Sequence, residues 1–146
     1  MGRPYRLGIF RRAFNSVTTL SLRLGIPFPG AYILTTVGRK TGSERSTPVL
    51  LIKDGGRRHL IAAYGVVGWV HNARAAGTVR ISRGRRSTEM SIDELSPEQA
   101  APILKTYVRR APVVLPYFDA GRNSSLEAFA DEASRHPVFR LTPISP

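Results

Sequence analysis

The stretch from Ala31 to Tyr64 reads AYILTTVGRKTGSERSTPVLLIKDGGRRHLIAAY and decides the expected fold. Three runs rich in β-branched, aromatic and other apolar residues, 31–37, 45–53 and 57–64, are separated by the short turns GRKTGSE and DGG. Runs of this kind, bounded by glycine-containing turns, are typical of strands joined as hairpins. The stretch therefore predicts three antiparallel strands in sequence order.

The residues that follow predict one short helix and more strands. WVHNARAA, residues 69–76, is helix-like and is stopped by Gly77. TVRISR (78–83) and RRSTEMSI (85–92) alternate in polarity and meet at Gly84, which predicts another hairpin. HPVFRLTPI, residues 136–144, predicts a short closing strand.

The last third of the chain is mainly helical in pattern. Ser96 and Gln99 can form a capping box around Pro97 at the first helical position. The predicted buried face of this helix is Ala100, Ile103, Leu104, Tyr107 and Val108. After the proline-interrupted stretch APVVLPYF (111–118), Ser124 and Glu127 suggest a second box, with Leu126, Phe129 and Ala133 buried. We therefore predict an α+β fold: a meander-like small antiparallel β-barrel with peripheral helices and one exposed, basic face, as a single domain over residues 1–146.

The first segment is basic and amphipathic. Apolar residues recur at helical spacing between residues 9 and 24, with five arginines among them and just before them. We predict a helix over about residues 5–24, which either packs on the domain or rests on an anionic membrane. No apolar run is long enough to span a bilayer and no signal-peptide pattern is present, so we expect a cytoplasmic protein, with membrane association through the first helix as the alternative to packing on the domain.

The charge balance favours anionic partners. Lys and Arg number 22 against 10 Asp and Glu, a formal net charge of +12. Nucleic acid, an anionic membrane surface and a polyanionic small molecule are all compatible with that charge. The chain has no cysteine, and its three scattered histidines have no ligand spacing, so no metal site is predicted and each histidine is expected to be structural.

The turn GRKTGSE is the first candidate site. Gly38 and Gly42 permit positive φ, so backbone N–H groups could converge on one point beside the cations of Arg39, Lys40 and Arg45. Hydroxyl donors stand nearby at Thr41, Ser43, Ser46 and Thr47, and we expect Glu44 to pair with one of the cations. The alternative is a solvated basic hairpin turn. The spacing is not that of a Walker loop.

Other residues indicate where a planar group could lie. Trp69 could stack on a ring or plug the barrel, and Tyr64 is the best placed of Tyr64, Tyr107 and Tyr117 to offer a hydroxyl to a substrate. No nucleophile elbow and no carboxylate pair are present. If the chain is an enzyme, a bound cofactor therefore carries the reactive chemistry.

The segment from Ala31 to Ile92 resembles the deazaflavin (F420)-dependent nitroreductase family of mycobacteria and related actinobacteria. The shared motifs are L-T-T-x-G-R-K-[ST]-G-x-x-R-x-x-P, the following D-G hairpin, and W-x-x-N-x-x-A at Trp69, Asn72 and Ala75. The resemblance implies a split β-barrel of the FMN-binding kind that binds coenzyme F420, with FMN as the alternative. It implies that the cofactor contacts are Arg39, Lys40, Thr41, Gly42, Arg45, Ser46, Thr47, Pro48, Ala62, Ala63, Tyr64, Gly65, Trp69 and Asn72.

The implied activity is hydride transfer from the reduced deazaflavin to an electron-poor acceptor, a quinone, an enone or a nitroaromatic, with Tyr64 as hydrogen-bond donor. The alternatives are an FMN-dependent oxidoreductase and a basic module that binds anions or nucleic acid without catalysis. We expect a small-molecule acceptor, no specific nucleic acid, and a monomer or homodimer. The loop after Tyr64 is short and lacks the lysine of better-known members, for which Arg57, Arg58 or Arg74 could compensate.

Overall fold

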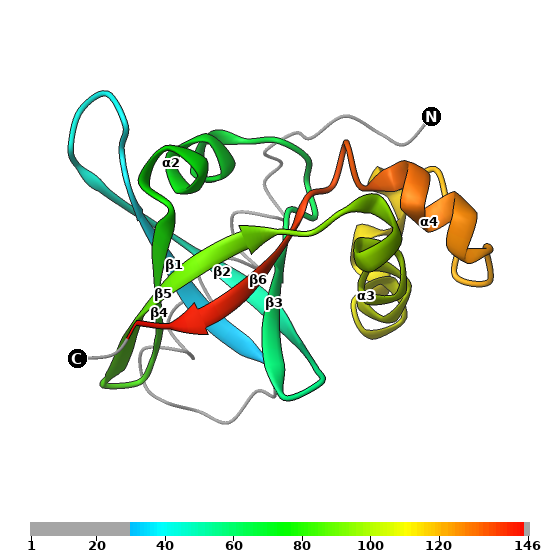
Figure 1. The fold of residues 1–146 in the computed structure, drawn as a ribbon, viewed down its shortest axis with the longest axis horizontal. Helices are drawn as coiled ribbons and strands as arrows, with labels where there is room; N and C mark the ends of the chain where they lie inside the picture. Colours follow the sequence, from blue (N-terminus) through cyan, green and yellow to red (C-terminus); the bar gives the residue numbers. More distant parts are fainter. Residues whose placement is uncertain (1–29, 145–146) are drawn as a thin grey trace.

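The computed structural model describes residues 30–144 of the chain (Figure 1). Seven-residue β1 contains the first predicted strand, and the other elements follow it closely in the predicted order. The bounds are β1 Ala31–Val37, β2 Glu44–Asp54, β3 Arg57–Ile61, α2 Gly68–Ala76, β4 Thr78–Arg83, β5 Arg86–Glu94, α3 Pro97–Arg110, the 3₁₀ helix η1 Pro112–Tyr117, α4 Leu126–Glu132 and β6 Val138–Pro143.

The strands form a closed barrel in the order β1-β2-β3-β6-β5-β4, and every neighbouring pair is antiparallel. The predicted α+β fold, a small antiparallel barrel with peripheral helices, is confirmed. The meander-like order is wrong at two pairings, because β3 pairs with β6 rather than with β4, and β4 pairs with β1. The crossover through α3 and α4 returns the chain so that its last strand closes the barrel (Figure 1).

Two hydrophobic cores hold the barrel and its helices together. Strand residues of one parity, such as Leu34, Leu60 and Phe139, fill the barrel interior together with Val70 and Ala73 of α2. Residues of the other parity face outward and bury a second core against α3, η1 and α4, with Ile52, Ile61, Leu104, Val108 and Phe129 as members. Burying each such side chain contributes about 1.5–3 kcal/mol.

The predicted C-terminal end of α2 and the predicted N-terminal start of α3 are confirmed. In α3 the Gln99 N–H donates to Ser96 Oγ (3.3 Å) and the Ser96 N–H donates to Gln99 Oε1 (3.2 Å), which completes the capping box. All five predicted core residues of α3 are buried. Helix α2 ends at Gly77, whose φ of 74° lets its N–H donate to the Ala73 carbonyl.

Three local predictions need correction. Strand β3 ends at Ile61, not at Tyr64: the Ala62 N–H still donates to the Pro137 carbonyl, but Pro137 has no N–H with which to continue the pairing. The cap of α4 is Ser125, whose side chain accepts from the Ala128 N–H, so the predicted box was one residue too early.

The first residue of α4, Leu126, is about half exposed rather than buried, whereas Phe129 and Ala133 are buried as predicted. The stretch APVVLPYF forms the short 3₁₀ helix η1, since its prolines lack the N–H groups that a longer α-helix needs.

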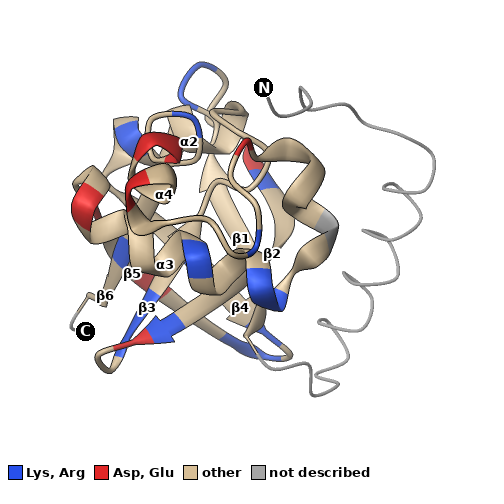
Figure 2. Cartoon of the chain, turned by 90° about the vertical axis from the view of Figure 1, so that its right-hand side faces the viewer, with Lys and Arg blue, Asp and Glu red and all other residues tan. Residues whose placement is uncertain are grey.

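Basic side chains gather at the end of the barrel away from α2. The β2–β3 and β4–β5 hairpins carry Lys and Arg there, as the blue segments beside β3 and β4 in Figure 2 show. The basic region predicted for one face of the barrel therefore lies largely at one end of it.

The amphipathic helix predicted over residues 5–24 lies outside the described residues. Within residues 30–144, no helix is both long and apolar enough to cross a membrane.

Candidate functional site

The β1–β2 turn is held in shape by its own hydrogen bonds. The Gly38 N–H donates to the Ser43 carbonyl (2.7 Å), and the Gly42 N–H donates to the Gly38 carbonyl (2.8 Å). Gly42 has a φ of 74°, a conformation that favours glycine. The Ser43 N–H donates to Thr41 Oγ1 (3.2 Å). These three N–H groups are therefore used within the turn, whose cations are carried on exposed side chains.

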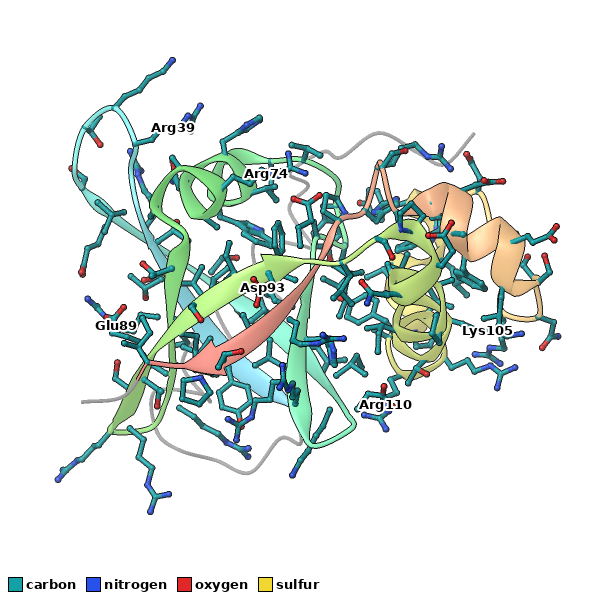
Figure 3. All side chains as sticks on the ribbon, viewed as in Figure 1. Arg39, Arg74, Glu89, Asp93, Lys105 and Arg110 are labelled. Atoms are coloured by element: carbon teal, nitrogen blue, oxygen red, sulfur yellow. The ribbon has the colours of Figure 1, made fainter. Side chains whose placement is uncertain are left out.

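Asn72 of α2 anchors this turn to the barrel. Its Oδ1 accepts from the backbone N–H of Arg39 (3.1 Å) and from Arg39 Nη1 (3.0 Å). Its Nδ2 donates to Thr36 Oγ1 at the end of β1 (3.4 Å). Asn72 and Thr36 are both buried. Figure 3 shows Arg39 at the base of the turn, next to α2. One buried amide thus fixes the position of the turn and of its first cation.

The other two cations of the turn are exposed and make no ion pair within residues 30–144. Lys40 and Arg45 are these cations. The expected pairing of Glu44 with a cation of the turn is wrong, since Glu44 binds Arg80 of β4 (2.9 Å). Arg80 also binds Glu89, and these hydrogen bonds, that to Glu44 first, raise the pKa of Arg80. The turn therefore keeps a positive charge that no acid of the described residues neutralises, which suits an anionic ligand.

The alternation of β2 divides the predicted contacts between two faces. Thr36 pairs with Arg45, and Leu34 pairs with Thr47, so Arg45 and Thr47 lie on the face that continues the barrel interior. Ser46 and Pro48 lie on the outer face, where Ser46 Oγ is 2.9 Å from Thr35 Oγ1. Arg45 and Thr47 therefore lie on the same face as Thr36, which Asn72 of α2 contacts. Ser46 and Pro48 lie on the opposite face.

The segment after β3 offers one functional side chain. Ala62 is buried in the barrel core and Ala63 in the core under α3, with exposed fractions of 1% and 7%. Tyr64 is partly exposed, and its ring meets Tyr117 edge-on with centroids 4.9 Å apart. Gly65 has a φ of 96° and turns the chain toward α2. A ligand at this segment can therefore contact backbone and the side chain of Tyr64.

The three tyrosines considered from the sequence lie close together. Tyr107 of α3 is buried, and burial raises its pKa, with a smaller contribution from the neighbouring Tyr64. Tyr107 is therefore a neutral phenol at any physiological pH. Of the three, Tyr107 belongs to the core, whereas Tyr64 and Tyr117 lie at the edge of that core.

His136 fixes the backbone beneath Tyr64. Its Nδ1 is 3.0 Å from the Ala62 carbonyl oxygen and its Nε2 is 2.9 Å from the Tyr117 carbonyl oxygen. The ring also stacks on Phe118 at 3.8 Å. His136 is structural, as predicted, and it positions a candidate site segment.

Trp69 and Asn72 stand on the same short helix and join the two parts of the site. Trp69 packs on the barrel core and meets Phe139 edge-on with centroids 6.0 Å apart, so at least one edge of its indole plugs the barrel. Part of its surface remains exposed. Because α2 begins directly after the Tyr64 segment and holds the β1–β2 turn, it couples these two regions.

The arginines that could replace the lysine missing from the loop after Tyr64 are paired with an acid or lie far from the β1–β2 turn. Arg74 forms a two-pronged ion pair with Glu94, with both N–O distances 2.9 Å. Arg57 and Arg58 are residues of β3 and pair with the last residues of β2, about 30 Å along that strand from the β1–β2 turn. The grip on an anion at the turn therefore rests on the cations of the turn itself.

Comparison with solved structures shows which class of fold this is. An F420-H2 dependent reductase is 21% identical over 77% of this chain and 94% of that chain, with a TM-score of 0.53. A structure described as a domain-swapped dimer is also 21% identical, over 87% of this chain and 95% of its own, with a TM-score of 0.57. A putative pyridoxamine 5'-phosphate oxidase from Listeria innocua is 11% identical over 80% and 85%, with a TM-score of 0.55. The fold is thus a split barrel of the pyridoxamine-oxidase-like kind.

The family is shown by the sequence itself. Residues 9–120 match the model of the F420H(2)-dependent quinone reductase family, so the chain belongs to that family. It is an oxidoreductase that depends on coenzyme F420. The resemblance noted from the motifs is confirmed. The family match favours coenzyme F420 over FMN, and an enzyme over a non-catalytic binding module.

Proposed function

We propose that this oxidoreductase reduces a quinone-type acceptor with the reduced coenzyme, and that the β1–β2 turn holds the anionic tail of the coenzyme. The observation that carries the proposal is a turn fixed by Asn72 with Lys40 and Arg45 unpaired by any acid of residues 30–144. Deazaflavin coenzymes of this class carry a phosphate and a polyglutamate chain. Several cations on a pre-shaped turn fit such a polyanion.

Three residues supply the grip. Arg39 gives one guanidinium N–H to Asn72 and keeps its remaining donors for an oxyanion. Arg45 offers a second fork, and Lys40 a point charge at the exposed part of the turn. Thr47 follows Arg45 on the same face of β2 and extends this surface toward the barrel. Ser46 and Pro48 support the turn from the outer face in this arrangement.

The chemistry needs an acceptor held beside the coenzyme and stabilised as it gains charge. The bound coenzyme supplies a hydride when reduced. Tyr64 donates a hydrogen bond to the acceptor oxygen, which stabilises negative charge as the carbonyl is reduced. The buried backbone of Ala62 and Ala63, fixed by His136, keeps Tyr64 in place. Trp69 closes the barrel side and excludes water.

Coenzyme binding is tested by titrating the purified chain with coenzyme F420 and following the deazaflavin fluorescence. A saturable change at micromolar coenzyme is expected. Absence of any saturable change would contradict the assigned grip.

The acceptor is tested by steady-state reduction of a benzoquinone, a cyclic enone and a nitroaromatic under the same conditions. The quinone is expected to give the highest kcat/KM. A nitroaromatic or an enone that is reduced faster than every quinone tested would replace the proposed acceptor.

Oligomeric state and membrane contact extend the proposal. One structural relative is described as a domain-swapped dimer, and the same arrangement is the homodimer that we propose for this chain. Light scattering at several protein concentrations measures it, and a concentration-independent monomer would exclude it. Sedimentation with anionic vesicles, with and without residues 1–24, measures the proposed membrane contact of the first segment.

A further inference from the structure

The barrel end opposite α2 is lined by charge that points inward. Side chains two positions apart on a strand share a face, so each residue beyond a core residue continues the barrel interior. Four residues occupy such positions at this end: Tyr32 beyond Leu34, Lys53 beyond Leu51, Arg58 beyond Leu60, and Arg83 beyond Ile81. We refer to Tyr32, Lys53, Arg58, Arg83 and Arg86 as the basic mouth.

Like charges stand directly opposite one another at the basic mouth. Lys53 pairs with Arg58 across β2 and β3, and Arg83 pairs with Arg86 across β4 and β5. Directly opposed like charges destabilise a sheet. None of these four cations makes an ion pair within residues 30–144. The sequence of residues 1–29 contains no Asp or Glu that could neutralise them.

One arginine of each pair lies over the same aromatic ring, and the pair Lys53 and Arg58 also lines a hollow. The guanidinium carbons of Arg58 and Arg83 lie 5.3 Å and 5.9 Å from the centroid of the Tyr32 ring. Beside Arg58 a hollow of about 210 Å³ is lined by Lys53 and Arg57, with Met90 and Leu141 as apolar walls. Figure 2 shows the basic residues of both hairpins at this end. This end of the barrel therefore combines arginine guanidiniums, the ammonium group of Lys53 and an apolar surface formed by Met90 and Leu141.

We propose that the basic mouth is a second anion-binding site, which takes a phosphate group. A phosphate dianion placed between opposed cations would turn repulsion into charge-assisted hydrogen bonds, and arginine forks match its oxygens. The apolar walls suit an organic group attached to that phosphate. The site lies at the opposite end of β2 from the β1–β2 turn, about 30 Å along the strand, so it is separate from the proposed grip on the coenzyme.

The first test is an NMR titration of the full chain with inorganic phosphate at low salt, which reports both ends separately. Saturable shifts are expected for the amides of Gly55, Gly56 and Gly84, in the two hairpins. Shifts confined to the turn between Gly38 and Ser43, or shifts at the hairpins that never saturate, would overturn the proposal. Coenzyme binding plays no part in this readout, so failure here leaves the proposed function standing.

The second test uses charge-matched variants. R58Q/R83Q removes the two guanidiniums over Tyr32, and R109Q/R122Q removes two exposed cations of the helical region. Phosphate affinity is expected to fall about tenfold or more in R58Q/R83Q and to stay within about twofold in the control. Phosphate should also raise the Tm of the wild type and of the control but not that of R58Q/R83Q. Equal losses in both variants would mean a general charge effect and would contradict the site.

The phosphate can come from a soluble ester or from a lipid headgroup, and vesicles distinguish the two. Co-sedimentation with phosphatidylcholine vesicles, with and without phosphatidic acid, is compared between R58Q/R83Q and R109Q/R122Q. A larger loss in R58Q/R83Q assigns a headgroup. Equal sedimentation of the two variants, with phosphate binding lost only in R58Q/R83Q, assigns a soluble phosphate. If R58Q/R83Q changes neither phosphate binding nor co-sedimentation with the vesicles, the proposal is rejected.

Discussion

The two ends of the barrel both carry several cations, yet they hold them differently. At the α2 end a buried amide, Asn72, bonds Arg39 twice and fixes the turn that carries Lys40 and Arg45. At the hairpin end, Lys53 faces Arg58 and Arg83 faces Arg86, and the guanidiniums of Arg58 and Arg83 lie over the Tyr32 ring. The first end has a pre-shaped geometry, and the second has concentrated charge without a polar anchor.

This difference teaches what distinguishes a specific grip from a general attraction. A fixed donor set loses little conformational entropy on binding, so it can select one polyanion with high affinity. Exposed long side chains that are held only by stacking on a ring must be ordered by the ligand. We therefore expect the α2 end to select the coenzyme and the hairpin end to accept a wider range of phosphates.

The largest effect is expected from removing the unpaired cations of the turn. K40Q/R45Q deletes two charge-assisted contacts to the tail, each worth about 1.5–3 kcal/mol, so coenzyme affinity should fall about a hundredfold or more. Fluorescence titration measures it. The matched variant K53Q/R58Q removes the same charge from the hairpin end and should bind the coenzyme within about twofold of the wild type. Equal losses in the two variants would erase the distinction between the ends.

A smaller effect is expected when the anchor itself is removed. Asn72→Ala leaves the Arg39 N–H and the Thr36 hydroxyl without their partner, which should cost about 2–3 kcal/mol of unfolding free energy. Coenzyme affinity should fall about tenfold, because the turn loses its fixed position. Denaturant unfolding and titration measure the two effects. Asn72→Asp keeps the acceptor for Arg39 and should retain more affinity; a ranking in the other order would contradict the anchoring role.

The next effect concerns Tyr64 and the rate of reduction. Tyr64→Phe removes the hydroxyl proposed to stabilise the acceptor, so kcat should fall about tenfold or more while the Kd of the coenzyme stays unchanged. Steady-state kinetics with a quinone measures this. Tyr117→Phe alters the edge-on neighbour of Tyr64 and serves as the control. An undiminished kcat in Tyr64→Phe would remove this residue from the mechanism.

The smallest effect is a pH dependence of stability that belongs to neither end. His59 is buried, its Nδ1 lies 3.1 Å from the Ile52 carbonyl oxygen, and burial lowers its pKa below the ordinary 6.5. A lowered pKa in the folded state means that the unfolded chain binds the proton more readily. Stability should therefore be full above about pH 7 and decline as the pH falls below about 6.5.

Thermal unfolding between about pH 7.5 and 5 measures this decline in the wild type and in His59→Asn, which keeps an N–H donor near the Ile52 carbonyl. The variant should lose part of the decline. If both chains lose the same stability over this range, the pH dependence comes from other groups.

Sequence patterns were sufficient for much of the framework because local chemistry decides it. Ser96, Pro97 and Gln99 begin α3, and Gly77 ends α2, since caps and a left-handed residue act over one turn of chain. The place of β6 between β3 and β5 was beyond such patterns, because strand pairing across a crossover of some 40 residues is a long-range choice.

The candidate site shows the same division. The motif itself predicted a binding site at the turn from Gly38 to Arg45, and this role stays a proposal. The sequence analysis grouped Ser46 with Thr47 and treated Asn72 as a contact of the cofactor. Alternation in β2 puts the first two on opposite faces, and the fold uses three hydrogen bonds of Asn72 within the chain. A sequence lists donors but not the partners that already occupy them.

The sequence by itself determined the strands and helices, the excess of cations and the family, because these follow from short-range propensity, composition and motif. Only the tertiary structure decided how those cations are used. Closure of the barrel brought Asn72 to Arg39 and Glu44 to Arg80. The reason is that electrostatic and hydrogen-bond partners are chosen by distance in space, which the register of the sheet fixes and the order of residues along the chain does not.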